Sequence, residues 1–235
     1  MEAVPGPVAD ERGRQWDAAT GVLAAILFAV SFFLPSSPPK ADDSVVEITR
    51  FFVDKRSSVL AASVLIALGA VAFLWWLGAF RSYLRAAEGG GGRLSAAAFG
   101  GGVVGIAVTL VGAAVFAAIS FRAAQLGQLV VVRALFDLSN NAFAIAGGGF
   151  VTLLAAASCS GARSGALPPW AYWSGSVLAV ANAVAFAALF ASSGFFSAGG
   201  AYGFIVFAAT VLWVVAVSLL MMARAGVPPR PLARP

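Results

Sequence analysis

The polar residues with the clearest chemical capacity are grouped in one otherwise apolar stretch of the chain. Arg133, Asp137 and Asn141 follow one another at intervals of four residues, and Asn140 lies beside them. On a helix this spacing places the three side chains on one face. A carboxylate there could carry a proton or a cation, or bind a polar ligand, with Asn141 orienting the bound group.

A structural interpretation accounts for the same residues. Arg133 and Asp137 would form an ion pair on the helix surface, near the helix end, where partial hydration lowers the free energy of burying a charge. The neighbouring asparagines would hydrogen-bond to Asn182 or Thr109 and so join two helices. We favour this interpretation. The candidate ligand- or ion-binding residues are Arg133, Asp137, Asn140, Asn141 and Asn182.

The residue types that the chain lacks exclude most catalytic chemistry. It has no histidine and one cysteine, Cys159. Histidine-ligated zinc or haem, Ser–His nucleophiles and Cys-x-x-Cys redox pairs are therefore excluded. One acid within the apolar segments cannot form a catalytic aspartate pair, and the chain has no phosphate-loop motif. We predict that the protein is not an enzyme and has no catalytic residue, metal site or cofactor.

The composition places these residues in a membrane protein. Hydrophobic residues make up 60% of the chain and charged residues 11%, and the mean hydropathy is +0.91. Soluble domains are about 45–50% apolar and about 25% charged, and a soluble core could not bury so large an excess. The net charge of +5 comes from short basic clusters between apolar runs. That pattern is typical of lipid headgroup anchors, and we expect no nucleic-acid partner.

Six apolar stretches are long enough to cross a bilayer, which needs about 20 residues per helix. We therefore predict an all-α fold, an integral membrane bundle of six transmembrane helices. Residues 1–15 would be an N-terminal cytoplasmic segment, 16–223 a single domain, and 224–235 a disordered, basic, proline-rich tail. The acids Asp10, Glu11 and Asp17 precede or begin the first span, which argues for a retained helix rather than a cleaved signal peptide. The spans are predicted at about 16–34, 58–80, 95–120, 134–158, 170–190 and 202–223.

The segment between the first two spans contains its own helix pattern. Ser44 and Glu47 have the spacing of a capping box, and Val45, Ile48 and Phe52 recur on one face. We predict an amphipathic helix over about 44–57 that lies at the membrane interface. It could act as a lid over an outward-facing cavity. The structural alternative, which we favour, is a connecting helix that seals the bundle.

Glycines form two ordered groups within the spans. Gly101, Gly105 and Gly112 share one stripe of the third span, and Gly147–Gly149 lie in the middle of the fourth. Small residues at such spacing let helices approach closely. A glycine triplet could also mark a broken helix at a binding site. We favour close packing and predict these helix-packing residues: Gly101, Gly105, Gly112, Gly147, Gly148 and Gly149.

The distribution of basic residues predicts the orientation in the membrane. The two termini and the second and fourth loops carry nine Lys or Arg residues, and the opposite side carries six. By the positive-inside rule, both termini are cytoplasmic. The 13 Arg against 2 Lys, with abundant Ala, Gly and Val, indicate a GC-rich bacterial genome. We therefore expect a multi-pass protein of the bacterial plasma membrane.

Two segments carry a resemblance to a known group of proteins. They are the polar stretch 42–56 and the sequence Trp75-Trp-Leu-Gly-x-Phe-Arg-x-Tyr-Leu-Arg85 at the end of the second span. In this layout the chain resembles uncharacterised six-span membrane proteins of GC-rich, actinobacterial-type bacteria. The resemblance extends loosely over the whole chain and implies no assigned activity.

The function predicted from these features is binding without catalysis. The partner would be the lipid bilayer itself and a lipid, a hydrophobic small molecule or a partner subunit, with a homo-oligomer as a further option. An apolar, glycine-rich bundle with few internal polar groups favours this class. The alternative is a small transporter or channel subunit that uses Asp137 in the fourth helix.

Overall fold

The computed structural model describes residues 7–225, so the predicted tail lies outside the described residues from position 226 on. The described part forms seven α-helices, and six of them are long and apolar enough to cross a membrane. The prediction of an all-helical chain with six long apolar helices is thus confirmed. The helices are α1 (Pro7–Phe33), α2 (Val45–Asp54), α3 (Arg56–Glu88), α4 (Arg93–Ala118), α5 (Leu129–Ser164), α6 (Pro169–Val184) and α7 (Ala201–Ala225). A π-helical turn, η1 (Ile119–Ala123), extends α4, and a 3-10 turn, η2 (Ala185–Leu189), extends α6.

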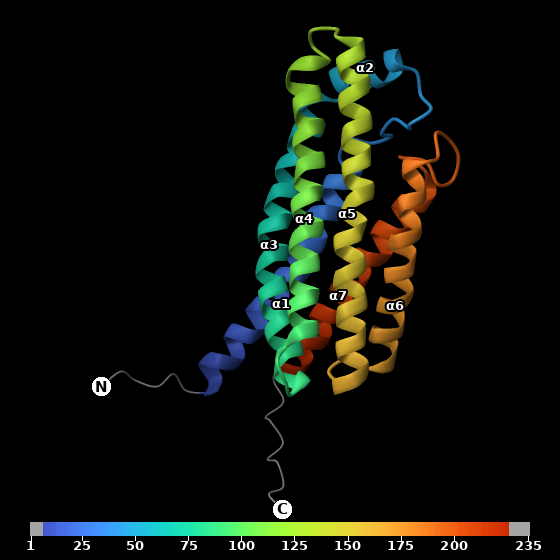
Figure 1. The fold of residues 1–235 in the computed structure, drawn as a ribbon. Helices are drawn as coiled ribbons and strands as arrows, with labels where there is room; N and C mark the ends of the chain where they lie inside the picture. Colours follow the sequence, from blue (N-terminus) through green and yellow to red (C-terminus); the bar gives the residue numbers. More distant parts are fainter. Residues whose placement is uncertain (1–6, 226–235) are drawn as a thin grey trace, which may run out of the picture.

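The six long helices run alternately up and down (Figure 1). The start of α1 and the end of α7 lie at one end of the bundle, which we call the terminal end. The short helix α2 lies at the other end, the α2 end. Helix α1 packs against α3 and α7, and α5 packs against α4 on one side and α6 on the other. Helices from both halves of the sequence therefore share one core.

Several helices are longer than the apolar runs that predict them. Helix α3 continues to Glu88 rather than ending near residue 80, and α5 begins at Leu129 rather than near 134. A charged residue such as Arg81 ends the apolar run, but the helix continues beyond it. Leu84, on this continuation, is fully buried. The apolar stretch 129–132, which precedes the predicted fourth span, belongs to α5, where Val132 is fully buried.

The interior of the bundle is built around aromatic side chains of α3. Trp76 is fully buried and stacks on Phe80 with 4.8 Å between the ring centroids. Both Trp75 and Trp76 lie near the end of the second predicted span, where tryptophan often occupies the membrane interface, but Trp76 lies in the core. Trp75 is 64% exposed. One residue of helix rotates the side chain by about 100°, which is enough to separate a core position from a surface position.

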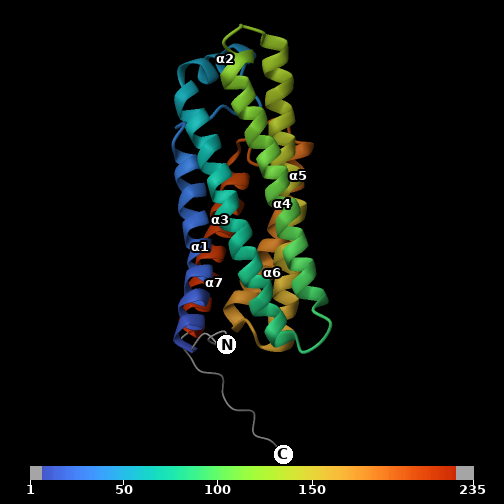
Figure 2. The ribbon, with the colours of Figure 1, turned by 90° about the vertical axis from the view of Figure 1, so that its left-hand side faces the viewer.

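Helices α3, α4 and α5 extend past the other long helices at the α2 end (Figure 2). Helices α3 and α5 have 33 and 36 residues. At a rise of about 1.5 Å per residue they are about 50 and 54 Å long, against about 30 Å for a bilayer core. The projecting ends of these helices, with η1 and α2, form what we call the head. Its core contains Ile48, Phe52, Val59, Ile119, Ala123, Ala124, Val132 and Phe136.

Helix α2 packs its apolar face into this head. Ile48 and Phe52 are fully buried, and the Phe52 ring lies edge-on to Phe136 of α5 at 6.2 Å between centroids. The helix ends at Asp54, so the predicted range of 44–57 is too long. Val59, at the start of α3, contributes to the same core.

The capping box at the start of α2 predicts a pH-dependent stability. Hydrogen bonds from the Ser44 hydroxyl and then from the Ser44 backbone N–H hold the pKa of the Glu47 carboxyl below its usual value. A lowered pKa in the folded state means that this contribution is present above the unfolded pKa, about 4.3, and is lost as pH falls through the folded value. We expect Glu47→Ala to lower the unfolding midpoint by roughly two degrees at pH 7. Thermal scans from pH 7 to pH 3 should show this gap narrowing, and a gap that widens on acidification would contradict the assignment.

Candidate functional site

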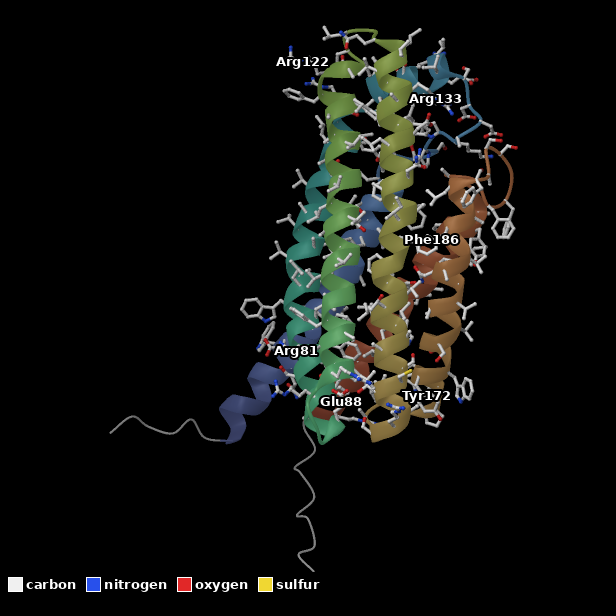
Figure 3. All side chains as sticks on the ribbon, viewed as in Figure 1. Arg81, Glu88, Arg122, Arg133, Tyr172 and Phe186 are labelled. Atoms are coloured by element: carbon white, nitrogen blue, oxygen red, sulfur yellow. The ribbon has the colours of Figure 1, made fainter. Side chains whose placement is uncertain are left out.

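The polar residues that the sequence singled out on α5 lie at the α2 end, on the surface. Arg133 Nε lies 3.0 Å from Asp137 Oδ2, and the two side chains are 39% and 47% exposed. The Arg133 guanidinium also donates hydrogen bonds to the carbonyls of Ala41, at 2.9 Å, and Asp43, at 3.3 Å. Figure 3 shows Arg133 on the side of α5 that faces the segment before α2. Arg133 thus joins α5 to that segment, a contact that spacing along one helix does not reveal.

The segment before α2 is also tied to the segment between α6 and α7. The Ala41 N–H donates to the Ala198 carbonyl at 3.1 Å. Gly199 has a φ of +77°, and an added Cβ there would lie 3.2 Å from the Pro39 carbonyl oxygen. The segment before α2, the segment between α6 and α7, and α5 therefore form one contact network at the α2 end. Among the described residues of this network, Arg133 is the only cationic side chain that bonds to both the backbone and a carboxylate.

The three candidate asparagines are not brought together. Asn140 donates to the Phe136 carbonyl of its own helix at 3.0 Å, and Asn141 is exposed. Asn182 of α6 is buried and donates to Thr210 Oγ1 of α7 at 3.2 Å. The expected hydrogen bonds from Asn140 to Asn182 or Thr109 were wrong, because Asn182 faces α7.

The ordered glycines lie at helix contacts, and Gly101, Gly105 and Gly149 lie at the contact between α4 and α5. A Cβ at Gly101 would lie 2.6 Å from the Leu153 backbone nitrogen and 2.7 Å from the Gly149 carbonyl oxygen. Gly112 and Gly148 instead face aromatic rings, those of Phe143 and Phe186. Gly105 faces Ala146 and Phe150, and Gly147 faces the Asn182 backbone. Helix α5 continues unbroken through residues 147–149, so these glycines occupy helix contacts rather than a helix break.

A second region, at the terminal end, contains a cleft that the sequence did not indicate. The cleft has a volume of about 1100 Å³ and mainly apolar walls. One face of α3 forms its floor, and α1, α7 and the turn between α5 and α6 contribute to its sides. We call it the terminal cleft. The lining residues used below are Asp17, Trp75, Gly78, Tyr83, Ala166 and Arg224.

Polar groups of opposite charge line the terminal cleft. Arg224 Nη1 donates to Tyr83 Oη at 2.6 Å and to the Ala166 carbonyl at 2.5 Å. The Trp75 indole N–H donates to Asp17 Oδ1 at 2.8 Å. Both of these hydrogen-bond partners of Arg224 are neutral, and neither of the two ion pairs between described side chains includes Arg224. The cleft therefore combines a guanidinium, a carboxylate and apolar walls.

The floor of the cleft has room for a ligand chain. A Cβ at Gly78 would meet no atom within 4 Å. Val71, Leu68 and Val64 lie on the same face of α3, about two to four turns from Gly78 toward the α2 end. They are 65%, 52% and 58% exposed. Residues at such i, i+3 and i+4 spacing form a continuous stripe. An apolar chain can lie along this stripe and enter the cleft at Gly78.

The sequence missed this site because its residues come from α1, α3, α4, α7 and the turn between α5 and α6. In the sequence, Trp75 and Tyr83 stand out only as part of the stretch that ends the second predicted span, and Asp17 only as an acid that argues against a signal peptide. The one available signal was the cluster of Trp, Tyr and Arg residues that closes the second apolar run. Nothing in that cluster identifies Asp17 or Arg224 as neighbours.

Comparison with protein-family models, with curated proteins and with solved structures gave no match to this chain. The function is therefore argued from the geometry alone. Of the two regions, the Arg133 network joins segments of the chain to one another, whereas the terminal cleft has space for another molecule.

Proposed function

We propose that the protein is inserted in a membrane through its six long helices and binds an amphiphilic molecule, a lipid or a hydrophobic small molecule, in the terminal cleft. Binding would occur without chemical conversion of the ligand. The observation that carries this proposal is the cleft of about 1100 Å³ with apolar walls and charged groups at its sides. Ligand pockets combine these features, with apolar surface supplying affinity and a few polar groups setting orientation.

The orientation that fits this proposal places the terminal end in the cytoplasm of a bacterium. Nine of the 15 Lys and Arg residues lie on the predicted cytoplasmic side. Trp16, Trp75 and Trp173 are 76%, 64% and 64% exposed, as expected for aromatic residues at the headgroup level. The cleft would then open at the inner headgroup region, and α2 would lie at the outer surface, where the head seals the bundle.

The position of the cleft favours a lipid-like ligand over a partner subunit. Its floor continues into the exposed apolar stripe of α3, which would face acyl chains in a bilayer. A ligand can therefore reach the cleft sideways from the membrane, with its apolar part never exposed to water. Each CH₂ group of the ligand that is exposed to water instead raises its free energy by about 0.8 kcal/mol.

Lipid retention by two matched glycine variants tests the proposal. Gly78→Leu places a side chain into the open space of the cleft, and Gly100→Leu places the same side chain into open space on α4, outside the cleft. Both changes replace a helical glycine, so both should preserve or improve helix stability. We expect Gly78→Leu to reduce the lipid that co-purifies in mild detergent by about tenfold or more, since a clash above about 1.4 kcal/mol lowers affinity tenfold. Mass spectrometry of extracted lipids at matched protein yield measures this.

Equal retention by Gly78→Leu, Gly100→Leu and the unmodified protein would overturn the proposal. Asp137→Asn provides the comparison with the transporter alternative. In our proposal this variant retains the ligand, because Asp137 is paired with Arg133 at the opposite end of the bundle. Loss of the ligand in Asp137→Asn alone would move the binding site to α5 and favour the alternative.

A further inference from the structure

The terminal cleft presents charges of both signs, and this restricts the headgroup it can accept. Arg224 and Tyr83 form one polar side, and Asp17 and Trp75 form the other. A purely anionic headgroup would be attracted to Arg224 but repelled by the Asp17 carboxylate. A purely cationic headgroup would be attracted to the Asp17 carboxylate but repelled by the Arg224 guanidinium. Each single-sign ligand therefore leaves one of the two charges without a complementary partner.

The Arg224 side suits a phosphate. A guanidinium has five N–H donors in a planar fork, and the two recorded hydrogen bonds of Arg224 both start from Nη1. The remaining donors can bind two oxygens of one phosphate group, which is the geometry that arginine favours. Tyr83 and the Ala166 carbonyl hold Nη1 in place, so less side-chain entropy is lost when the phosphate binds.

The Asp17 side suits an ammonium group. The Trp75 indole N–H fixes the carboxylate through Oδ1, and each carboxylate oxygen can accept further hydrogen bonds. The indole ring of Trp75 is 64% exposed beside it. Ammonium groups bind to tryptophan faces through cation–π attraction and to carboxylates through charge-assisted hydrogen bonds.

From these two sides we infer that the cleft selects a zwitterionic phospholipid whose headgroup carries a phosphate and an ammonium. The phosphate binds Arg224, the ammonium binds Asp17 and Trp75, and an acyl chain lies along α3 from Gly78 toward Val64. This inference rests on the proposed function, because it assigns the ligand of the same cleft. It adds a headgroup preference that a general lipid-binding surface would lack.

The test uses the full-length protein and two lipids with identical acyl chains. The protein is reconstituted in nanodiscs that contain equal amounts of phosphatidylethanolamine, which carries phosphate and ammonium, and phosphatidylglycerol, which carries only the phosphate charge. Native mass spectrometry then counts the molecules of each lipid that the released protein retains. Only phosphatidylethanolamine offers an ammonium group to the Asp17 carboxylate, so we expect its retention to exceed that of phosphatidylglycerol by about tenfold or more.

Two variants separate the two sides of the headgroup. Asp17→Asn keeps an oxygen that can accept the Trp75 hydrogen bond but removes the charge, and we expect it to bring the two lipids to similar retention. Arg224→Gln removes the phosphate partner and should lower the retention of both. Asp42→Asn, the same charge change at an exposed position of the α2 end, serves as the control and should keep the wild-type preference.

The outcomes distinguish this inference from the proposed function. Equal retention of the two lipids by the unmodified protein, with both lost in Gly78→Leu, would overturn the headgroup preference and leave the cleft as a lipid site. Preference for phosphatidylglycerol would also overturn it. Retention that Gly78→Leu does not change would overturn the proposed function together with the inference. Melting temperatures of Asp17→Asn and Arg224→Gln, measured in the same detergent, show whether a lost preference reflects lost folding.

Discussion

Replacement of Gly149 by alanine is expected to lower the thermal unfolding midpoint by roughly 5–12 °C. A Cβ at Gly149 would lie 2.5 Å from the Gly105 Cα and 2.6 Å from the Gly101 carbonyl oxygen. Both are backbone atoms of α4, so no side chain can rotate away from the new group. Helices α4 and α5 must therefore move apart. The side chains packed between them then lose van der Waals contacts.

A neighbouring glycine provides the matched control. Gly100 precedes Gly101 on α4, and a Cβ there would meet no atom within 4 Å. Alanine is about 0.8–1.0 kcal/mol more favourable than glycine inside a helix, so Gly100→Ala should match or exceed the stability of the unmodified protein. Thermal unfolding monitored by fluorescence-detected size-exclusion chromatography compares the variants. A Gly149→Ala protein that unfolds at the unmodified temperature would contradict this close approach of α4 and α5.

Arg133→Met is expected to release the segment between α1 and α2 from the bundle. The variant removes the partner of three acceptors at once, namely the Asp137 carboxylate and the carbonyls of Ala41 and Asp43. Hydrogen bonds to charged groups contribute about 1.5–3 kcal/mol, which corresponds to a tenfold or greater change in a local opening equilibrium. We therefore expect amide hydrogen exchange in residues 40–44 to become about tenfold faster, including that of the Ala41 N–H bonded to Ala198.

Hydrogen exchange measured by mass spectrometry, with peptides that cover this segment, tests the expectation. Arg122→Met is the control, because Arg122 lies on η1 at the same end and contacts the Phe121 ring, 5.6 Å from its centroid. Figure 3 places Arg122 at the tip of the bundle, apart from Arg133. Faster exchange in both variants, or in neither, would contradict a specific role of Arg133 in holding the segment.

These two expectations separate the structural from the functional residues on α5. The sequence drew attention to Asp137 because an acid in an apolar run is rare and unfavourable. Its partner Arg133 was also predicted, since the pair follows the i, i+4 spacing of one helix. The carbonyl partners of Arg133 lie about 90 residues earlier in the chain, and no local pattern indicates them. The charge pair could therefore be anticipated, whereas its role in joining two segments could not.

The glycines illustrate the same division. Their spacing predicted close helix contacts, and the lengths of the apolar runs predicted which helices exist. The spacing does not identify the partner helix: Gly101 and Gly149 face each other, whereas Gly112 and Gly148 face phenylalanine rings. Small residues permit close approach on any helix, and which of them meet depends on the rotation of each helix about its axis.

What the sequence determined by itself is the helical, apolar character of the chain, because hydropathy and helix length are properties of continuous segments. The amphipathic start of α2 was also readable, since a capping box spans four residues. The tertiary structure alone decided that Trp76 is buried and Trp75 exposed, and that Asp17, Gly78, Ala166 and Arg224 line one cleft. These residues belong to four segments that local periodicity treats independently. They come together only because the packing of glycine-lined helix faces sets the rotation and spacing of the helices, and this packing is a property of the whole bundle.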